Sequence, residues 1–471
     1  MRELLAELPR VAAAPAFAGV EGPLCETGLA DGPALLLQAL AQAWPAEGRR
    51  WLQRAQAADL AARSLGSHDA LAELSPPGLV AVLDVLRVAS GPGHGAEGPG
   101  LLLKPGFVRR LLALLGPGHL ERVAQWPEEA GGGPDGVHGL VDAVVTVLYR
   151  PFASSKGTPD SVLRSLQQVL LEERAVAHVM GALRRVALHG LIIPLSFVSR
   201  LVLSATSYAQ EYVQHGGLEP GFLARLLAPA NVPSVVVDAL LILSQLARLS
   251  KGNYSQINAA NIYPALSELL AHEDPGVRAR ACNLVGNLCR HNAYFYAEIR
   301  AHDLLPALVE RCSDPDRSTR KFACFAIGNS AFHNDALYGE LKDAIAPLVR
   351  LLGDDEDKTR ANAAGALGNL VRNSDSLCED LVRHGAVDAL MDTAMGPRND
   401  ENVSSDGQSP LKIALFSLGN MCAYRVCRDA ILACPLFLEA IEALGRSTDD
   451  PTVGKYVGRI RVKLVHYAEA R

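Results

Sequence analysis

The sequence predicts an all-α protein in which one helical unit is repeated along the chain. It has 471 residues, more than a single hydrophobic core usually accommodates, so several domains or an extended array are expected. Ala and Leu dominate, and aromatic residues make up only 5%, which favours helices over sheets. The dipeptide Gly-Asn also recurs at nearly constant intervals in the second half. These observations together predict a repeat protein.

The overall charge argues against the strongly basic classes of protein. The chain has 45 basic and 51 acidic residues, a formal net charge of −6, whereas proteins that bind nucleic acids or anionic membranes usually carry a basic surface. Its most apolar stretch, residues 191–198, contains Pro194 and is too short to cross a bilayer. Glu3 and Glu7 precede the first apolar stretch, which does not fit a secretory signal. We therefore expect protein partners, no nucleic acid and no membrane.

The cysteines indicate reduced thiols and a cytoplasmic chain. There are nine, an odd number, without any Cys-x-x-Cys pair. Five lie in helical patterns with apolar neighbours, as expected of core residues: Cys282, Cys289, Cys312, Cys324 and Cys378. Three more lack zinc-finger spacing and are also expected in the core: Cys422, Cys427 and Cys434. No triad, HExxH or paired-carboxylate signature occurs, so the sequence predicts no metal, cofactor or catalytic residue.

The first 210 residues have an irregular organisation. Residues 1–90 are predicted to be an irregular helical region, and residues 91–137 to be Gly/Pro-rich linkers that flank a short helical segment. The two glycine-rich breaks, at 91–100 and 127–136, are not expected to hold a helix. Residues 138–210 are predicted to be helical, in irregular repeats.

Residues 211–471 are predicted to be regular repeats. The asparagines of the four Gly-Asn pairs, Asn287, Asn329, Asn369 and Asn420, are 42, 40 and 51 residues apart. A leucine in a preceding short helix recurs in the same phase: Leu266, Leu308, Leu348 and Leu390. An arginine nine residues before the Asn recurs as well: Arg278, Arg320 and Arg360. The period matches armadillo or HEAT units, so we expect an armadillo/HEAT-like, right-handed α-solenoid.

The last long helix of each unit has a predicted buried stripe. Positions six before, two before and one after the Asn lie on one side of a helix. They are occupied by Ala281, Ala323, Ala363 and Ala414; by Val285, Ile327, Leu367 and Leu418; and by Leu288, Ser330, Leu370 and Met421. Asp274-Pro275 and Asp314-Pro315 are predicted to begin such helices. The longest interval contains a polar stretch, residues 396–409, that is predicted to be an inserted loop.

The Asn series lies to the side of this stripe, and two interpretations are open. The four amides could hold the backbone of an extended peptide along a concave groove, because an amide both donates and accepts. Alternatively, each amide could tie its helix to the neighbouring repeat. Four residues before each Asn, where importin-type grooves carry Trp, stand Asn283, Phe325, Gly365 and Phe416. Nuclear-localisation-signal binding is therefore not supported, although Phe325 and Phe416 could offer apolar contacts to a partner.

The other recurring polar residues are expected to be structural. Arg278, Arg320 and Arg360 fall near the buried stripe, where each needs a fixed carboxylate or carbonyl partner. His291 and His333 follow their Asn by four residues. No carboxylate, Ser or Cys partner recurs with them, so a role at the helix end is expected.

Four stretches of the repeats resemble the C-terminal armadillo region of Fused-type serine/threonine protein kinases, most closely the plant and algal members. They are EDPGVRARACNLVGNLCRHNAYFY (273–296), RSTRKFACFAIGNSAFHNDALY (317–338), DKTRANAAGALGNLVRNSDSLCEDLV (357–382) and SPLKIALFSLGNMC (409–422). The kinase motifs themselves are missing from the sequence: it has no HRD loop or DFG aspartate, and the glycine cluster at 131–136 is not followed by a helix-opening Lys. We therefore expect a region that is not itself an enzyme.

The resemblance implies a regulatory scaffold of such a kinase. Its implied partners are kinesin-like motors, microtubule-associated proteins and the kinase domain itself. The implied settings are cytokinesis, motile cilia or hedgehog signalling, with a location in the cytoplasm, at the cytoskeleton or in a cilium. The alternative is a free-standing karyopherin- or catenin-like armadillo adaptor with no link to a kinase.

Overall fold

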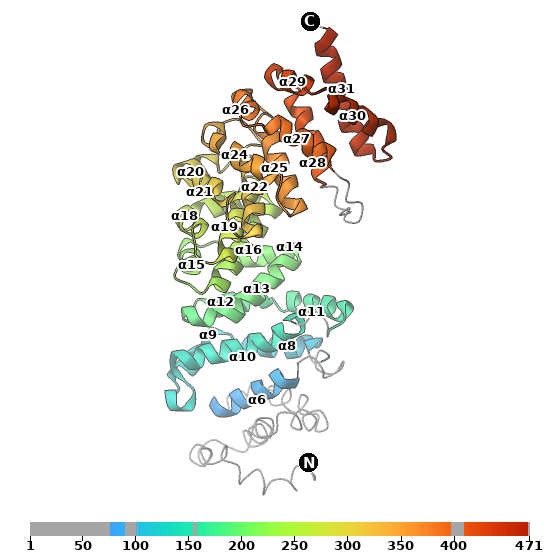
Figure 1. The fold of residues 1–471 in the computed structure, drawn as a ribbon. Helices are drawn as coiled ribbons and strands as arrows, with labels where there is room; N and C mark the ends of the chain where they lie inside the picture. The colour runs from blue at the N-terminus through green and yellow to red at the C-terminus, as the bar shows by residue number, and fades with distance from the viewer. Residues whose placement is uncertain (1–75, 90–99, 101, 154–157, 397–408, 470–471) are drawn as a thin grey trace. The chain divides into compact units, whose positions relative to one another are not determined.

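The computed structural model describes residues 76–89, 100, 102–153, 158–396 and 409–469. Every regular element in these ranges is a helix, as predicted. The chain forms two compact units, Met1–Gly217 and Leu218–Arg471, whose helices are labelled in Figure 1. Most of the region predicted at 1–90, the break at 91–100 except Gly100, and the loop predicted at 396–409 except its two end residues lie outside the described ranges.

The first unit combines short helices with one long helix, α10. The bounds are α6 Pro76–Ala89, α8 Pro105–Ala113, α9 Pro117–Gln125, α10 Gly133–Ala153, α11 Asp160–Glu172, α12 Ala175–Leu183, α13 Ile192–Ser204 and α14 Thr206–Gln214, with 3-10 turns η3 Glu128–Ala130 and η4 Leu188–Leu191. Helix α10 packs against α6, α9 and α13. Its Val141, Val144 and Val145 are completely buried, so the core of this unit runs along α10.

The glycine-rich stretch at 127–136 was predicted to hold no helix, and this prediction is wrong. It contains η3 and then the first turn of α10, which begins at Gly133. Gly131 and Gly133 adopt positive φ angles of 80° and 69°, a conformation that glycine reaches without strain. The glycines therefore make a tight turn into α10. Burial of the apolar face of α10 offsets the low helix propensity of this turn.

The second unit contains the repeats. Its elements are α15 Pro220–Leu226, α16 Pro233–Leu249, η5 Lys251–Asn253, α17 Tyr254–Ala259, α18 Tyr263–Leu270, α19 Pro275–Leu288, α20 Tyr296–Ala301, α21 Leu304–Arg311, α22 Arg317–Ser330, α23 Tyr338–Leu341, η6 Lys342–Ala344, α24 Ile345–Leu351, α25 Asp357–Asn369, α26 Cys378–Arg383, α27 Ala386–Met395, α28 Pro410–Met421, α29 Arg425–Leu432, α30 Pro435–Ser447 and α31 Pro451–Glu469.

The last long helices of the repeats stack in chain order. Helix α16 packs on α19, α19 on α22, α22 on α25, α25 on α28, and α28 on the final helix α31, as can be followed in Figure 1. We call α16, α19, α22, α25 and α28 the repeat helices. All twelve residues of the predicted stripe are buried. The predicted facing of these helices is therefore confirmed.

Of the two predicted helix starts, one is confirmed and one is wrong. Asp274 caps α19 and accepts a hydrogen bond from the backbone N–H of Val277 at 3.0 Å. Helix α22, however, begins at Arg317, and its cap is Asp316, which accepts from the N–H of Thr319 at 2.7 Å. The carboxylate of Asp314 instead forms an ion pair with Arg278 of α19. Asp314 is thus committed to the contact between repeats.

The eight cysteines in the described residues are free thiols, and seven of them are buried, in agreement with a role in the core. Over the same residues, no single helix combines the length and apolar character of a membrane span. Residues 233–249 and 251–259 meet that criterion only as a pair, bent by 117°.

Candidate interaction surface

The Asn series connects neighbouring repeats through hydrogen bonds to backbone carbonyls. The Nδ2 of Asn329 donates to the carbonyl oxygen of Gly286 at 2.8 Å. The Nδ2 of Asn369 donates to that of Gly328 at 2.9 Å, and the Nδ2 of Asn420 to that of Gly368 at 3.2 Å. The acceptor in each case is the glycine of the preceding Gly-Asn pair. The series is therefore a chain of contacts that runs from repeat to repeat.

The first member, Asn287, differs from the others. Its Nδ2 donates within α19, to the carbonyl of Asn283 at 3.0 Å. Its Oδ1 is buried and has no hydrogen-bond partner among the described residues. At the other end of the array, Lys463 of α31 takes the place of an asparagine and donates to the carbonyl of Gly419 at 2.8 Å. The carbonyl of the last Gly-Asn glycine therefore also accepts a hydrogen bond from the next helix, although α31 supplies a lysine in place of the asparagine.

These contacts favour the structural interpretation of the Asn series. The amide nitrogens of Asn329, Asn369 and Asn420 already donate to backbone carbonyls, and the Oδ1 of Asn420 accepts from Arg459 at 2.9 Å. These bonds orient each amide toward the preceding repeat and leave its second N–H for other contacts. We therefore assign the series to the cohesion of the repeats.

The predicted aromatic contacts, Phe325 and Phe416, are half-buried between helices. A Cβ added to Gly286 would lie 2.5 Å from the ring of Phe325, so this ring rests on the backbone of α19 where glycine leaves room. Phe416 packs against Tyr456 of α31, with ring centroids 5.6 Å apart, and Arg459 lies 5.7 Å from its centroid. Each ring therefore contributes to the packing of its helix, and one side of it stays accessible.

The arginine series has the predicted structural role: Arg278 and Arg320 join repeats, whereas Arg360 bonds within its own repeat, to the carbonyl of Asp354 at 2.7 Å and to the carboxylate of Asp357. Arg278 forms a two-pronged ion pair with Asp314, at 2.8 and 2.9 Å, and donates to the carbonyls of His272 and Glu273. Arg320 repeats this pattern one unit later, with Asp354 at 2.7 Å. Burial alone would raise the pKa of Asp314, but the hydrogen bonds from Arg278 and from the backbone N–H of Asp316 bring it below its ordinary value.

The residue four places after the Asn forms a third series. The Nε2 atoms of His291 and His333 lie 2.9 Å and 3.0 Å from the carbonyl oxygens of Arg248 and Cys289 in the repeat before. In the next repeat this position is Asn373, whose Nδ2 donates to the carbonyl of Phe332 at 3.1 Å. The expected role at the helix end is confirmed, because these side chains bind the carbonyls with which the preceding repeat helix ends.

One face of α22 and its immediate continuation remains rich in accessible aromatic rings. Phe322 and Phe325 are three residues apart on α22 and so lie on one side of it, and Phe332 follows two residues after the end of the helix. Phe322 and Phe325 are half-buried, and Phe332 is 36% exposed. Arg280 of α19 lies 5.6 Å from the centroid of Phe322, and Arg372, just after α25, lies 4.1 Å from that of Phe332. We call these five residues the phenylalanine–arginine face.

Sequence reasoning identified only Phe325 of this face. The signal for the rest was present, because Phe322 and Phe332 stand seven before and three after Asn329, positions that continue the Asn side of the helix. The two arginines belong to the neighbouring repeats. Their approach to the rings depends on the stacking of α19, α22 and α25, which the spacing within one repeat does not show.

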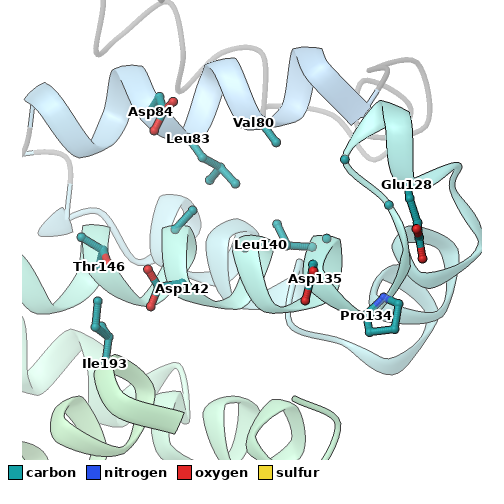
Figure 2. Close-up of a pocket in the computed structure, with 15 residues that line it drawn as sticks. Val80, Leu83, Asp84, Glu128, Pro134, Asp135, Leu140, Asp142, Thr146 and Ile193 are labelled. Carbon is teal, nitrogen blue, oxygen red and sulfur yellow. The ribbon is translucent and has the colours of Figure 1, made fainter. Parts of the chain in front are cut away.

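A cavity of about 690 Å³ in the first unit lies between α6 and α10. Figure 2 shows Val80 and Leu83 projecting from α6 toward α10, which contributes Leu140 and Asp142. Asp135 also lines the cavity. Among the described residues, no group of three or more His, Cys, Asp or Glu side chains is placed to hold a metal ion. We assign no ligand to this cavity.

Comparison with known proteins identifies related repeats and a related kinase. HEAT repeats match residues 263–368 and 305–392. The chain is 39% identical over 409 residues, 77% of its length, to the serine/threonine-protein kinase TIO of Arabidopsis thaliana. It spans only 30% of the length of that kinase.

Comparison with solved structures confirms the fold class. An engineered protein aligns over 98% of both chains with a TM-score of 0.72 at 18% identity. The described residues form helical repeats, in which no kinase domain is evident. Together with the kinase relative, these findings show that the chain belongs to the Fused-type serine/threonine kinases as a helical-repeat region of the all-α solenoid class.

Proposed function

We propose that this region is a protein-interaction scaffold of a Fused-type kinase, and that a partner binds on the phenylalanine–arginine face. One observation carries the proposal: two phenylalanines of α22 and a third just after its end are accessible, and arginines from both neighbouring repeats approach two of these rings. Aromatic and arginine side chains are the residues that most often dominate the energy of protein interfaces. The face thus combines the side chains that a binding site needs.

The chemistry of this face favours an extended segment with apolar and acidic side chains. Apolar groups would cover the exposed sides of the phenylalanine rings, and carboxylates would pair with Arg280 and Arg372. The rigid repeat stack holds the rings in place, so little conformational entropy is lost when a partner binds. The Asn series contributes indirectly, because it fixes the spacing between α19, α22 and α25.

The relation to a kinase supports a regulatory role and indicates which partners to test. The candidates are kinesin-like motors, microtubule-associated proteins and the kinase domain of the same protein family. Such partners place the scaffold in the cytoplasm, at the cytoskeleton or in a cilium. The kinship over three quarters of the chain favours this reading over an adaptor unrelated to a kinase.

The test compares full-length wild type with Phe322→Ala, Phe332→Ala and the control Leu436→Ala. Leu436 is 75% exposed on α30, so its truncation removes accessible apolar surface outside the face. Binding to immobilised kinase domain, kinesin-like tail and microtubule-associated protein is measured by biolayer interferometry, with a thermal melt of each variant. Loss of an aromatic anchor is expected to weaken binding about ten-fold. Equal binding by the face variants and wild type would overturn the proposal.

A further inference from the structure

The first unit contains an open pocket whose charged side chains are all basic. The pocket has a volume of about 600 Å³ and lies where the start of α9, helix α12 and the end of α14 meet. Its charged and titratable lining residues are Arg174, His178, Arg184, Arg185 and His215. Three arginines and two histidines thus converge, with no carboxylate in the lining itself.

The arginines are held in position by contacts at the edge of the pocket. The Nη2 of Arg174 lies 2.9 Å from the Nε2 of His215. The Nη2 of Arg184 donates to the carbonyls of His215 and Gly216, at 3.1 and 3.2 Å. Arg185 pairs with the exposed Glu121 at 3.1 Å. A guanidinium carries five N–H donors, and the contact of Arg174 with His215 uses one of its nitrogens, so Arg174 can also donate to a ligand.

One backbone feature adds to the positive character of the site. Helix α9 begins at Pro117 after the cap residue Gly116, which has no side chain to cap it, so the positive end of its dipole is open toward the pocket. At the start of α12 the situation is the opposite, because the N–H of Ala177 is already bound by Glu211 at 3.0 Å. The opening at α9 and the arginines therefore favour the same kind of ligand, an anion.

Arg174 occupies a backbone position that would suit glycine better. Its φ of 56° and ψ of 46° lie in the left-handed region, which is unfavourable for a residue with a Cβ. Arginine has no advantage over glycine for the backbone at this point. What Arg174 contributes is its side chain, because the guanidinium contacts His215 and lines the pocket.

The pKa values of both histidines are lowered, mainly by burial and in part by the neighbouring arginines. Burial, followed by repulsion from Arg174, lowers the pKa of His178. Burial and repulsion from Arg174 and Arg184 also lower the pKa of His215. An anion between these side chains would relieve the repulsion and favour the protonated imidazoles.

We propose that this pocket binds the phosphate group of a phosphorylated serine or threonine in a protein segment. Arg174 and Arg184 would grip the phosphate oxygens in the two-pronged manner typical of guanidinium groups. The pocket is larger than a phosphate group, and Leu115, Pro117 and Gly181 give it an apolar floor for the residues beside the modified side chain. A membrane headgroup is less well matched, since membrane binding usually draws on basic residues spread over a broad surface.

The test uses the full chain and a fluorescein-labelled library of phosphoserine peptides with randomised flanks, beside the same library without phosphate. Binding is read by fluorescence anisotropy. The variants are Arg174→Gly, Arg174→Lys, Arg184→Gln and the control Arg164→Gln, which removes an exposed charge of α11 outside the pocket. Arg174→Gly relieves the left-handed backbone, so it should fold at least as well as wild type while it loses the guanidinium.

The phosphorylated library is expected to bind at least ten-fold more tightly than its unphosphorylated counterpart. Arg174→Gly and Arg184→Gln should abolish most of this difference, Arg174→Lys should keep part of it, and Arg164→Gln should leave it unchanged. Equal binding of the two libraries, or equal loss in the Arg164→Gln control, would overturn the proposal. So would binding of vesicles that contain phosphoinositides, in place of the peptides, if it depended on Arg174. The pocket lies in the first unit and the phenylalanine–arginine face in the second, so either proposal can fail without the other.

Discussion

The side chain of Asn369 donates its amide hydrogen to the backbone carbonyl of Gly328, one repeat earlier, at 2.9 Å. This contact shows why Gly and Asn recur as a pair. At Gly286 and Gly368 the glycine leaves space for the next helix to come near its backbone, and the asparagine of the next repeat helix satisfies the glycine carbonyl. The pair is therefore a device for joining one repeat to the next.

The double variant Asn329→Ala/Asn369→Ala is expected to destabilise the repeats. It removes two inter-repeat hydrogen bonds and leaves the carbonyls of Gly286 and Gly328 without these donors, at a cost of about 1–3 kcal/mol for each. The measurement is urea unfolding of the full chain, followed by circular dichroism. Asn334→Ala is the control, because its Oδ1 accepts only a local bond from the N–H of Ala336. Unfolding midpoints that match between the double variant and this control would refute the assignment.

The glycines of the motif should differ sharply in their tolerance of alanine. A Cβ on Gly368 would lie 2.8 Å from the Cα of Ser417, whereas one on Gly328 would find its nearest atoms, those of Ala366, at 3.5 Å. Gly368→Ala should therefore cost about 1–3 kcal/mol through overpacking. Gly328→Ala should be neutral or stabilise by up to about 1 kcal/mol, since alanine favours the helix. Thermal melts compare the two, and a larger loss for Gly328→Ala would contradict the packing described.

Acid should weaken the second unit through its inter-repeat carboxylates. The pKa values of Asp314 and Asp354 lie below the ordinary 3.8 because, against the opposing effect of burial, Arg278 and Arg320 donate to them. A carboxyl with a lowered pKa stabilises the fold at pH values above its unfolded pKa, and this contribution is lost as the pH falls through its folded pKa. Urea unfolding between pH 6 and pH 2.5 should show that the free energy of unfolding declines as the pH falls. The decline should begin near pH 4, which is about the pKa of the unfolded carboxyl.

The variant Asp314→Asn serves as the comparison for this pH dependence. It should be less stable than wild type at pH 6, where Arg278 loses its ionised partner, and its stability should decline less steeply in acid. Wild-type and variant curves that run parallel over the whole range would show that this ion pair does not couple folding to pH.

Lys463 should matter for the end of the array. Its Nζ reaches the carbonyl of Gly419 at 2.8 Å, and burial followed by repulsion from Arg459 lowers its pKa. Lys463→Met keeps much of the packing and removes the donor, so α28 should exchange its amide hydrogens faster while α19 stays unchanged. Hydrogen exchange with mass spectrometry measures both helices in one experiment. If amide exchange became faster in α28 and α19 alike, or in neither helix, the contact of Lys463 would not be a local contact at the end of the array.

The period of the repeats and the buried stripe could be predicted because both follow from spacing along one helix. Ala363 and Leu367 are completely buried, as their positions relative to Asn369 indicate. The roles of the polar residues were harder to predict, since they depend on contacts between repeats. The partner of Asn369 is 41 residues away in the sequence, and the spacing alone made a peptide-binding groove the candidate site.

The remaining differences have identifiable physical causes. The turn into α10 was missed because composition does not show that Gly131 and Gly133 adopt positive φ angles. The start of α22 moved by two residues because the carboxylate of Asp314 is engaged by Arg278. The phenylalanine–arginine face was recognised only in part because its arginines come from adjacent repeats. In each case a tertiary contact decided between local alternatives.

The most direct test of the account compares Phe332→Ala with Asn369→Ala in the full chain. The same partner, one that wild type binds, is titrated against both variants, and each affinity is corrected for the folded fraction taken from a thermal melt. The account predicts that Phe332→Ala binds about ten-fold more weakly with an unchanged melting temperature. It predicts that Asn369→Ala keeps wild-type affinity and melts at a lower temperature. The reverse result, with binding lost in Asn369→Ala at an unshifted melt and retained in Phe332→Ala, would contradict it.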